Sequence, residues 1–552
     1  MGDRYDVGDL VADFLQRMDV TTVFGIVSVH NIPMTDAIGR RNAVRFVSAR
    51  AEYGGGHMAD AYARASGELG VLVSSTGPGA ANAVPALVEA GFAGTPLLHL
   101  TGQSPSSHID REMGTVHDVP GQTAMLDAVC KAAFRVRSAD NALGTLVEAA
   151  RLALTPPMGP VSVEIPIDIQ RTVIARPATL DRLTRPVPAP VSLDKAALDG
   201  LVERLKAATR PLLWVGNGGK HAGAAVRRLV DLGVPVITSW NGRGVIAETD
   251  PMSLAAMHGL PEVQAFLDTV DLLVVAGCRL RGHETQDQSL RLPENRVQID
   301  IDPRADGRTY PCGLFVHGDA EATLDAAADH LAGGLALDPA LPGDVAAVKA
   351  KARTAYHTFL DIYAPMPGVV RQALPEDGVL VRDVTLSHTT WGHKMFEILG
   401  PRDTIYPVGA AIGPGLAMGI GAALANGGRK TICLSGDGGF AMNLGELWTA
   451  ADENADVVFL VMNDRGFGVI KHIQDALYGG RHHFANPSPP DFDALARAAN
   501  IPYHCVISMD DLEAVLTAAV THAGPALVEV DMTAIGPYPR YFQPPPYAAA
   551  AR

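Results

Sequence analysis

Short apolar runs alternate with alanine-rich amphipathic stretches along almost the whole chain of 552 residues. Between residues 70 and 102, for example, GVLVSST is followed by AANAVPALVEAGFAG and then by PLLHLTG. Short β-branched runs are typical of buried strands, and strands that alternate with helices in this way form parallel sheets. The sequence therefore predicts an α/β fold built from doubly wound parallel sheets.

Two proline-rich segments divide this alternation, RPVPAPVS at 185–192 and LDPALPGD at 337–344. At about 150 residues per domain, a chain of this length holds about three to four domains. We expect three α/β domains and a short tail, with the bounds 1–180, 190–335, 345–535 and 536–552. The tail is rich in proline, and we expect it either to be disordered or to fold over a site as a lid.

The charge balance excludes several classes of partner. With 45 basic and 60 acidic residues, the formal net charge of −15 offers no basic face to nucleic acid or to anionic lipid.

The five cysteines include no CxxC pair, which argues against a zinc site or a disulfide framework. The first residues, MGDRYDVGDL, lack the apolar stretch of a signal peptide. We expect a cytoplasmic protein that acts on a small soluble substrate.

One uncharged segment, VGAAIGPGLAMGIGAALA at 408–425, is long enough to cross a membrane. Five glycines and Pro414 interrupt it, however, and no strongly apolar stretch accompanies them. We therefore expect a glycine-rich segment that is buried against another part of the protein.

The stretch LSGDGGFAMN at 434–443 places Asp437 between glycines, where a strand should give way to a helix near Phe440. Glycines let the backbone approach an anionic ligand, and a helix N-terminus offers it free amide donors. A carboxylate would repel a bare phosphate, but Mg2+ binds the oxygens of both groups. The stretch therefore predicts a site for Mg2+ and a phosphate, with a second metal ligand one helix and one strand downstream. The chain has no GxxxxGK[ST] motif, which argues against a P-loop nucleotide site.

These residues resemble the metal motif of the thiamine diphosphate (ThDP) dependent enzymes, in which GDG is followed, after a helix and a strand, by asparagine. Here Asp464 stands 27 residues after Asp437. The resemblance implies that Asp437, Asp464 and the backbone carbonyl of Gly466 bind Mg2+. Asparagine is more usual at position 464, but aspartate is also a competent ligand for a hard cation. Cofactor contacts are implied for the loop glycines, Gly436, Gly438 and Gly439.

A second motif near the N-terminus carries the same resemblance. ThDP enzymes of the acetohydroxyacid synthase and decarboxylase branch have a glutamate just before a helix of small residues. The stretch RAEYGGGHMADAYARASGELGVLVSSTGPGAANAV has this form, with Glu52 at the glutamate position. The family also shares VFG at 23–25 and GPVSVEIPIDIQ at 159–170. The resemblance covers residues 5–535 and implies a pyrimidine-binding (Pyr), a central and a diphosphate-binding (PP) domain.

The resemblance also implies roles for single residues. Glu52 would donate a proton to N1′ of the aminopyrimidine, which favours the tautomer that removes the thiazolium C2 proton. The bulky apolar residue beneath the cofactor falls at Ile412, and Ser387 resembles a diphosphate contact. His30 and His117 lie in loops that face the cofactor in relatives, so they are candidate catalytic residues. Further cofactor contacts are implied at Gly77, Pro78 and Ala410.

The resemblance leaves the reaction open. We expect an enzyme that makes or breaks a carbon–carbon bond next to a carbonyl, as a 2-oxo acid decarboxylase or an acetolactate synthase-like carboligase. Biosynthetic synthases usually have tryptophan where this chain has Ile473, which counts against that activity. The alternative enzyme is a 2-hydroxyacyl-CoA lyase. The alternative from another class is a catalytically silent ThDP-fold binding protein, although Glu52, Asp437 and Asp464 are all present.

Two further expectations concern assembly and the central domain. In the family the glutamate and the GDG loop come from different subunits, which implies a homodimer or homotetramer with sites at the subunit interface. Some relatives bind FAD or ADP in the central domain. Here Gly216 and Gly218 follow a predicted strand, but His221 stands where a dinucleotide fingerprint has its third glycine. The sequence therefore does not decide whether a nucleotide binds.

Overall fold

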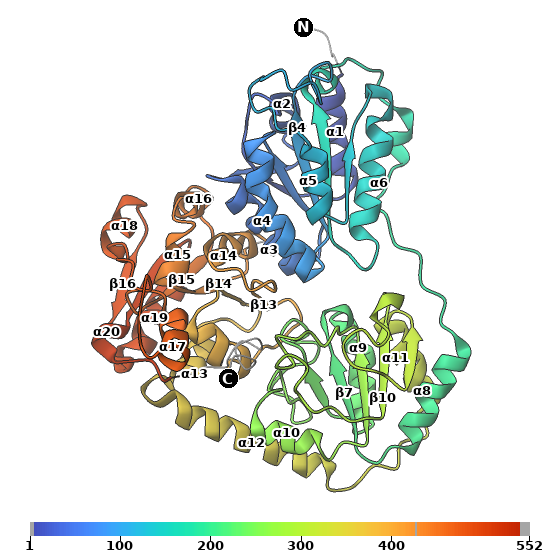
Figure 1. The fold of residues 1–552 in the computed structure, drawn as a ribbon, viewed down its shortest axis with the longest axis vertical. Helices are drawn as coiled ribbons and strands as arrows, with labels where there is room; N and C mark the ends of the chain where they lie inside the picture. Colours follow the sequence, from blue (N-terminus) through green and yellow to red (C-terminus); the bar gives the residue numbers. More distant parts are fainter. Residues whose placement is uncertain (1–4, 426–427, 541–552) are drawn as a thin grey trace.

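The computed structural model describes residues 5–425 and 428–540, and its strands form three separate sheets (Figure 1). The strands are β1 (Thr22–Gly25), β2 (Arg45–Ser48), β3 (Gly70–Ser74), β4 (Leu97–Gln103), β5 (Ala132–Arg135), β6 (Pro160–Pro166), β7 (Pro211–Val215), β8 (Val236–Thr238), β9 (Leu272–Ala276), β10 (Arg296–Asp300), β11 (Leu314–His317), β12 (Val379–Arg382), β13 (Thr404–Ile405), β14 (Thr431–Gly436), β15 (Val457–Asn463), β16 (Tyr503–Val506) and β17 (Ala526–Asp531).

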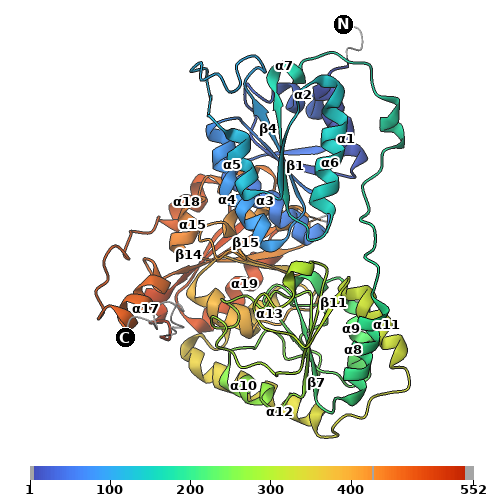
Figure 2. The same cartoon turned by 45° about the vertical axis from the view of Figure 1, so that its right-hand side comes forward.

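Each sheet is built from one continuous part of the chain. The first has the order β2-β1-β3-β4-β6-β5, the second β11-β10-β9-β7-β8, and the third β13-β12-β14-β15-β17-β16. Every pair of neighbouring strands in these sheets is parallel. Helices lie on both faces of the sheets, as Figures 1 and 2 show together. The predicted α/β class with three parallel-sheet units is therefore confirmed.

The helices follow the strands in the alternation that the sequence predicts. They are α1 (Val7–Arg17), α2 (Ile32–Arg41), α3 (Glu52–Ser66), α4 (Pro78–Ala93), α5 (Gln122–Val129), α6 (Ala142–Leu154), α7 (Ile167–Gln170), α8 (Lys195–Ala207), α9 (Gly223–Asp231), α10 (Pro261–Leu267), α11 (Ala320–His330), α12 (Leu341–Leu360), α13 (Met366–Ala373), α14 (Gly415–Leu424), α15 (Asp437–Ala441), α16 (Glu446–Asp452), α17 (Gly468–Leu477), α18 (Phe492–Ala498), α19 (Leu512–Thr521) and α20 (Met532–Ile535).

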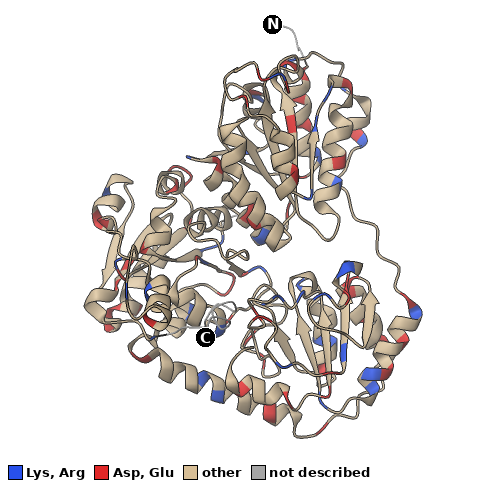
Figure 3. Ribbon diagram, in the orientation of Figure 1, with Lys and Arg blue, Asp and Glu red and all other residues tan. Residues whose placement is uncertain are grey.

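Two proline-containing segments lie between these units. Residues 183–194 contain neither helix nor strand and run along the outside of the molecule from the first unit to the second (Figure 2). The second segment, 337–344, contains the start of α12 at Leu341. Acidic and basic residues are interspersed over all three units in the ribbon of Figure 3.

The first and third units share one hydrophobic core, although the second unit separates them in sequence. Buried residues of α3, such as Met58 and Ala61, belong to the same core as Leu416 and Ile420 of α14. The two helices lie side by side in Figure 1. Glycine inside a helix costs about 1 kcal/mol relative to alanine. That cost has a reason here, because a Cβ atom at Gly421 would lie 2.1 Å from the carbonyl oxygen of Met58.

Candidate active site

The first functional side chain lies at the end of β14. Asp437 is the first residue of α15, so the expected helix start near Phe440 is wrong and the helix begins earlier. A carboxylate is favoured at this position by the helix dipole. Asp437 is 2% exposed, and its Oδ2 atom accepts a hydrogen bond from the backbone amide of Gly466 at 2.9 Å. A Cβ atom at Gly438 would lie 2.7 Å from the Phe467 ring, so this loop needs glycine to approach the next one.

That next loop follows β15 and carries the other predicted metal ligands. Arg465 and Gly466 have φ angles of 56° and 155°, which turn the backbone toward Asp437. Lys471 Nζ donates a hydrogen bond to the Asp464 carbonyl at 3.1 Å and secures the turn. Burial raises the pKa of Asp464, and burial together with the neighbouring Asp464 carboxylate raises the pKa of Asp437 to about 7. The structure thus brings the three predicted ligands together.

The chemistry of this donor set fits a hard divalent cation. Asp437 is buried and Asp464 is half-buried, and a cation between these two neighbouring carboxylates would remove the repulsion between them. Two carboxylates and a carbonyl offer only oxygen atoms, which are the ligands that Mg2+ prefers. A pocket opens beside them, and all the residues that line it, among them Ile412, Gly439, Ile470 and Met532, lie between positions 384 and 532.

A third buried carboxylate, which the sequence analysis missed, holds the loop before α14. Asp383 directly follows β12 and is fully buried. Its oxygens accept hydrogen bonds from the backbone amide of Gly413 at 3.1 and 3.0 Å and from that of Gly415 at 3.3 Å. Burial raises the pKa of Asp383 to about 6. The same loop carries Ile412, which is 40% exposed toward the pocket, and Ala410, whose φ angle is 62°.

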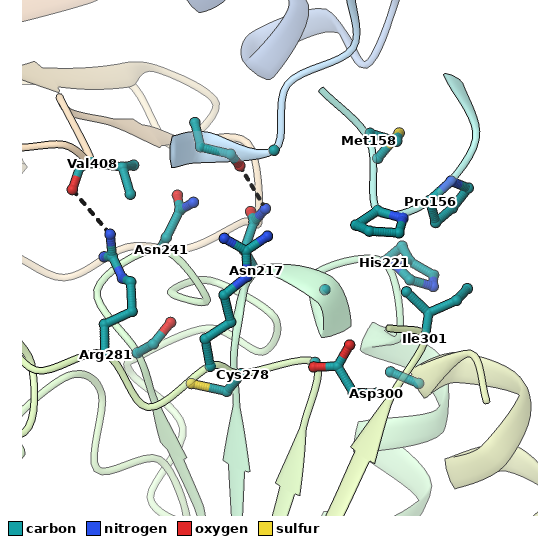
Figure 4. Close-up of a pocket in the computed structure, with 18 of the residues that line it drawn as sticks. Pro156, Met158, Asn217, His221, Asn241, Cys278, Arg281, Asp300, Ile301 and Val408 are labelled. Atoms are coloured by element: carbon teal, nitrogen blue, oxygen red, sulfur yellow. Dashed lines mark hydrogen bonds between the residues drawn. The ribbon is translucent and has the colours of Figure 1, made fainter. Parts of the chain in front are cut away.

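The other two units hold this loop from outside. Glu89 on α4 accepts hydrogen bonds from the backbone amides of Val408 and Gly409 at 2.5 and 2.9 Å. Arg64 on α3 forms an ion pair with Glu89 at 2.8 Å. Arg281 of the second unit donates to the Val408 carbonyl at 3.0 Å (Figure 4). All three units therefore meet at the backbone that leads to Ile412.

Ser387 stands at the start of a single π-helical turn, His388–Gly392, and is 1% exposed. Within this turn Thr390 departs from helical geometry, with φ −96° and ψ −105°. The hydroxyl group of Tyr538 lies 2.5 Å from Thr390 Oγ1 and is buried. The described start of the proline-rich tail is thus packed beside Ser387. Residues 541–552 of the predicted lid lie outside the described residues.

Glu52 lies in the first unit, as the first residue of α3, and is 7% exposed. Its Oε2 atom accepts a hydrogen bond from Asn82 Nδ2 at 3.4 Å. A Cβ atom at Gly79 would lie 2.5 Å from Glu52 Oε1, so the first turn of α4 fits closely against the carboxyl group. The pocket beside Asp437 is not lined by any residue before position 384. Within one chain, the structure therefore does not bring Glu52 into that pocket.

The two predicted catalytic histidines lie together near the same loop. The ring centroids of His30 and His117 are 5.2 Å apart, and burial lowers the pKa of His30. A Cβ atom at Gly77 would lie 2.2 Å from the His117 carbonyl oxygen, and its φ angle is 59°, so this position requires glycine. Pro78 follows as the first residue of α4. The structure therefore groups both histidines with the predicted cofactor contacts at Gly77 and Pro78.

A second pocket lies between the first and second units (Figure 4). Pro156 and Met158 line one side, and Asn217 and Asp300 line the other. Asn217 Nδ2 donates a hydrogen bond to the Ala93 carbonyl at 2.9 Å and connects the two sides. Asp300 ends β10, and burial raises its pKa. The pocket thus opens at the carboxyl ends of the strands, where ligands of open α/β sheets usually bind.

Comparison with known proteins agrees with this geometry. The N-terminal TPP binding domain of the thiamine pyrophosphate enzymes matches residues 5–131, their central domain matches 198–327, and their C-terminal TPP binding domain matches 386–530. Thiamine pyrophosphate is another name for ThDP. The chain therefore belongs to the family of ThDP-dependent enzymes, as its motifs predicted.

Curated relatives match the chain over nearly its whole length. The Pseudomonas aeruginosa protein named probable 2-ketoarginine decarboxylase AruI is 30% identical over 536 residues, which is 95% of this chain and 93% of that protein. The large subunit of Escherichia coli acetolactate synthase isozyme 1 is 28% identical, over 96% of this chain and 94% of that protein. A protein from rice named probable acetolactate synthase 2, chloroplastic, is 29% identical, over 96% and 83% respectively.

The glycine-rich segment is buried, as expected, from Gly413 to Ala423, and most of this part forms α14, whereas Gly409, Ala410 and Ile412 before it are exposed. In the described parts of the chain, no helix combines the length and the hydropathy that crossing a membrane requires.

Proposed function

We propose that this chain is a ThDP- and Mg2+-dependent enzyme that makes or breaks a carbon–carbon bond next to the carbonyl of a 2-oxo acid. The reaction is that of a decarboxylase or of an acetolactate synthase-like carboligase. One observation carries the proposal: the buried Asp437 and the half-buried Asp464 meet at the turn of Gly466 beside a pocket. Two carboxylates this close together repel each other when no cation lies between them, which favours a role in binding over a role in folding.

ThDP supplies an electron sink for the reacting carbon when it is bound. Asp437, Asp464 and the carbonyl of Gly466 would hold Mg2+, and the Mg2+ and Ser387 would bind the diphosphate. Ile412 would support the rings of the cofactor from below, because Asp383 fixes its loop and leaves its side chain exposed to the pocket. These residues bind and orient the cofactor.

Glu52 carries the proton chemistry in this proposal. Its carboxyl group is largely shielded from water, which suits a group that holds a proton at N1′ of the aminopyrimidine. Because Glu52 and the pocket beside Asp437 are separate within one chain, we propose a homodimer or homotetramer in which Glu52 of one protomer completes the site of another. Light scattering of the holoenzyme tests this assembly, and a catalytically active monomer would contradict it.

The side of the pocket that would receive the substrate is apolar. Phe467 and Ile470 line it and are each 38% exposed. They are followed on α17 by Ile473 at the position where synthases have tryptophan. These residues support a decarboxylase, or a carboligase other than the biosynthetic synthase. The relative named for 2-ketoarginine adds a guanidinium-bearing 2-oxo acid to the substrates that we would test.

The test is to incubate the Mg2+–ThDP enzyme separately with pyruvate, benzoylformate, 2-ketoarginine and a 2-hydroxyacyl-CoA, and to identify the products by mass spectrometry. An aldehyde or acetolactate from any oxo acid supports the proposal. Cleavage of the CoA ester with all three oxo acids untouched would assign the lyase reaction instead. A protein that turns over none of the four would contradict the proposal.

If the chain binds FAD or ADP, as some relatives do, the pocket shown in Figure 4 would be the place for it. Asn217 and Arg281 offer hydrogen-bond donors there, and Asp300 offers an acceptor for a ribose hydroxyl. Chromatography of the compounds released from denatured enzyme, followed by calorimetric titration with FAD and ADP, tests this part. Protein that contains neither and binds neither would remove the nucleotide from the proposal.

A further inference from the structure

Glu446 is a buried carboxylate with no role in the site described so far. It is the first residue of α16 and is 1% exposed. Its oxygens accept hydrogen bonds from the backbone amide of Arg50 at 3.0 and 3.2 Å and from that of Ala51 at 3.0 Å. Thr449 Oγ1 donates a further bond at 2.7 Å and orients the carboxylate. The third unit thus binds the backbone directly before Glu52 through hydrogen bonds.

The first unit is shaped to admit this carboxylate. A Cβ atom at Gly54 would lie 2.1 Å from Glu446 Oε1 and 2.5 Å from Cδ, so no side chain fits at that position of α3. Ala51 is the N-cap residue of α3 and has no side-chain acceptor of its own for the amide donors of the helix start. A carboxylate at this end also interacts favourably with the helix dipole. Glu446 therefore fixes both the position and the direction of the start of α3.

The same short stretch of chain also reaches the cofactor loops. Asp437 lies nine residues before Glu446. Between them, Asn443 Nδ2 donates a hydrogen bond at 2.7 Å to the carbonyl of Gly413, next to Ile412. Residues 437–446 thus contact the predicted metal site at one end and the backbone before Glu52 at the other.

We propose that Glu446 is a positioning residue that sets the location of the Glu52 carboxyl group. This inference rests on the proposed function, in which Glu52 acts on the cofactor held by another protomer. Glu446 then links the metal site of its own chain to the glutamate that serves the neighbouring site. It touches neither cofactor nor substrate.

The test compares Glu446→Gln and Glu446→Ala with wild-type holoenzyme. The measured quantities are the rate of hydrogen–deuterium exchange at C2 of bound ThDP, the ThDP dissociation constant, kcat and KM. Misplacing a catalytic group by about 1 Å costs up to about 100-fold in rate. We expect exchange and kcat to fall by about 10- to 100-fold in Glu446→Ala and by less in Glu446→Gln, which keeps an acceptor oxygen. The ThDP dissociation constant and KM should stay close to wild type.

Asp452→Asn is the matched control, because Asp452 forms an exposed ion pair with Arg50 at the same contact between the units. It should leave C2 exchange unchanged. Wild-type exchange in Glu446→Gln and Glu446→Ala would overturn the inference. If Glu446→Ala does not fold, Glu446→Gln decides alone by the same criterion. A loss of ThDP affinity in step with the loss of exchange would also overturn it, because Glu446 would then only stabilise the fold.

Glu52→Gln is measured alongside to separate the two proposals. If Glu52→Gln exchanges at the wild-type rate, the proposed function itself fails. If Glu52→Gln is slow and the Glu446 variants are not, only the positioning role of Glu446 fails.

Discussion

The carboxylate of Asp437 and the backbone amide of Gly466 are joined by a hydrogen bond of 2.9 Å. This bond connects the end of β14 to the turn after β15, and these two strands are neighbours in the third sheet. The positions of the predicted metal ligands are therefore set by a rigid parallel pair of strands. Ligands held in this way lose little conformational freedom when a cation binds.

The two aspartates should respond differently to substitution. Asp437→Ala removes a ligand and the acceptor for the Gly466 amide, so we expect the purified protein to lose Mg2+ and ThDP. Asp464→Asn introduces the residue more usual in the family and keeps a ligand oxygen, so we expect both to be retained. Metal analysis and cofactor quantification after gel filtration measure this. Full Mg2+ and ThDP occupancy in Asp437→Ala would place the metal site elsewhere.

Glu52→Gln tests the proton chemistry. Glutamine has nearly the same volume but does not exchange a proton with N1′, so ThDP binding should persist. General acid–base catalysis contributes about 100- to 10,000-fold, and C2 proton exchange should slow by a factor in this range. Exchange followed by proton NMR after acid quench provides the measurement. An exchange rate equal to that of wild type would exclude Glu52 from this role.

Because α3 and α14 are in close contact, we expect a single added methyl group between them to lower the stability of the protein. In Gly421→Ala the new Cβ would lie 2.1 Å from the Met58 carbonyl oxygen, so the helices must separate. We expect a loss of about 1–3 kcal/mol in stability, visible as a lower thermal transition. Gly39→Ala on α2 is the control, because in the described part of the chain no atom beyond its own helix backbone and chain neighbours lies within 4 Å of its Cβ position, and it should stabilise the protein slightly. Equal transitions in the two variants would refute this packing.

His57 on α3 predicts how stability depends on pH. It is fully buried, neither ring nitrogen has a hydrogen-bond partner in the described part of the chain, and burial lowers its pKa to about 3. Between pH 6.5 and 3 the unfolded chain therefore binds a proton that the folded chain does not, so stability falls as pH falls. At pH 5 this amounts to about 2 kcal/mol.

Replacing His57 removes this dependence. In His57→Leu, the loss of stability between pH 8 and pH 5 should be smaller than in wild type by about that amount. Denaturant unfolding at fixed protein concentration at the two pH values measures it. Parallel pH profiles for the two proteins would show that His57 titrates normally.

Local sequence patterns were sufficient to predict those parts of the fold that depend on residues adjacent in the sequence. Apolar runs bounded by glycine predicted the parallel strands, and the aspartate that follows one of them marked the proposed metal site. The helix start at Asp437 was missed because glycines favour loops in isolation, whereas here Gly438 and Gly439 adopt helical geometry. Phe467 and Asp383 lie so close to these two positions that a Cβ atom would meet them at 2.7 and 2.9 Å, a tertiary constraint that the local sequence does not contain.

Residues that act across the units could not be predicted. In the sequence, Glu89 and Glu446 are indistinguishable from other glutamates of predicted helices. In the structure, each accepts hydrogen bonds from backbone amides of a segment more than 300 residues away. Asp383 offered a signal, since it follows the strand VLVR just as Asp437 follows its own strand. That signal lacked the flanking glycines that made Asp437 conspicuous.

The core shared by α3 and α14 has a consequence for how the protein is made. About 350 residues separate the end of α3 from the start of α14, and ribosomes add roughly 5–20 residues per second. The small-residue face of α3 therefore stays uncovered for roughly 20 to 70 s during synthesis, until α14 has been made. Chains that stall before residue 415 expose this face permanently. Aggregation of truncated products should therefore begin there.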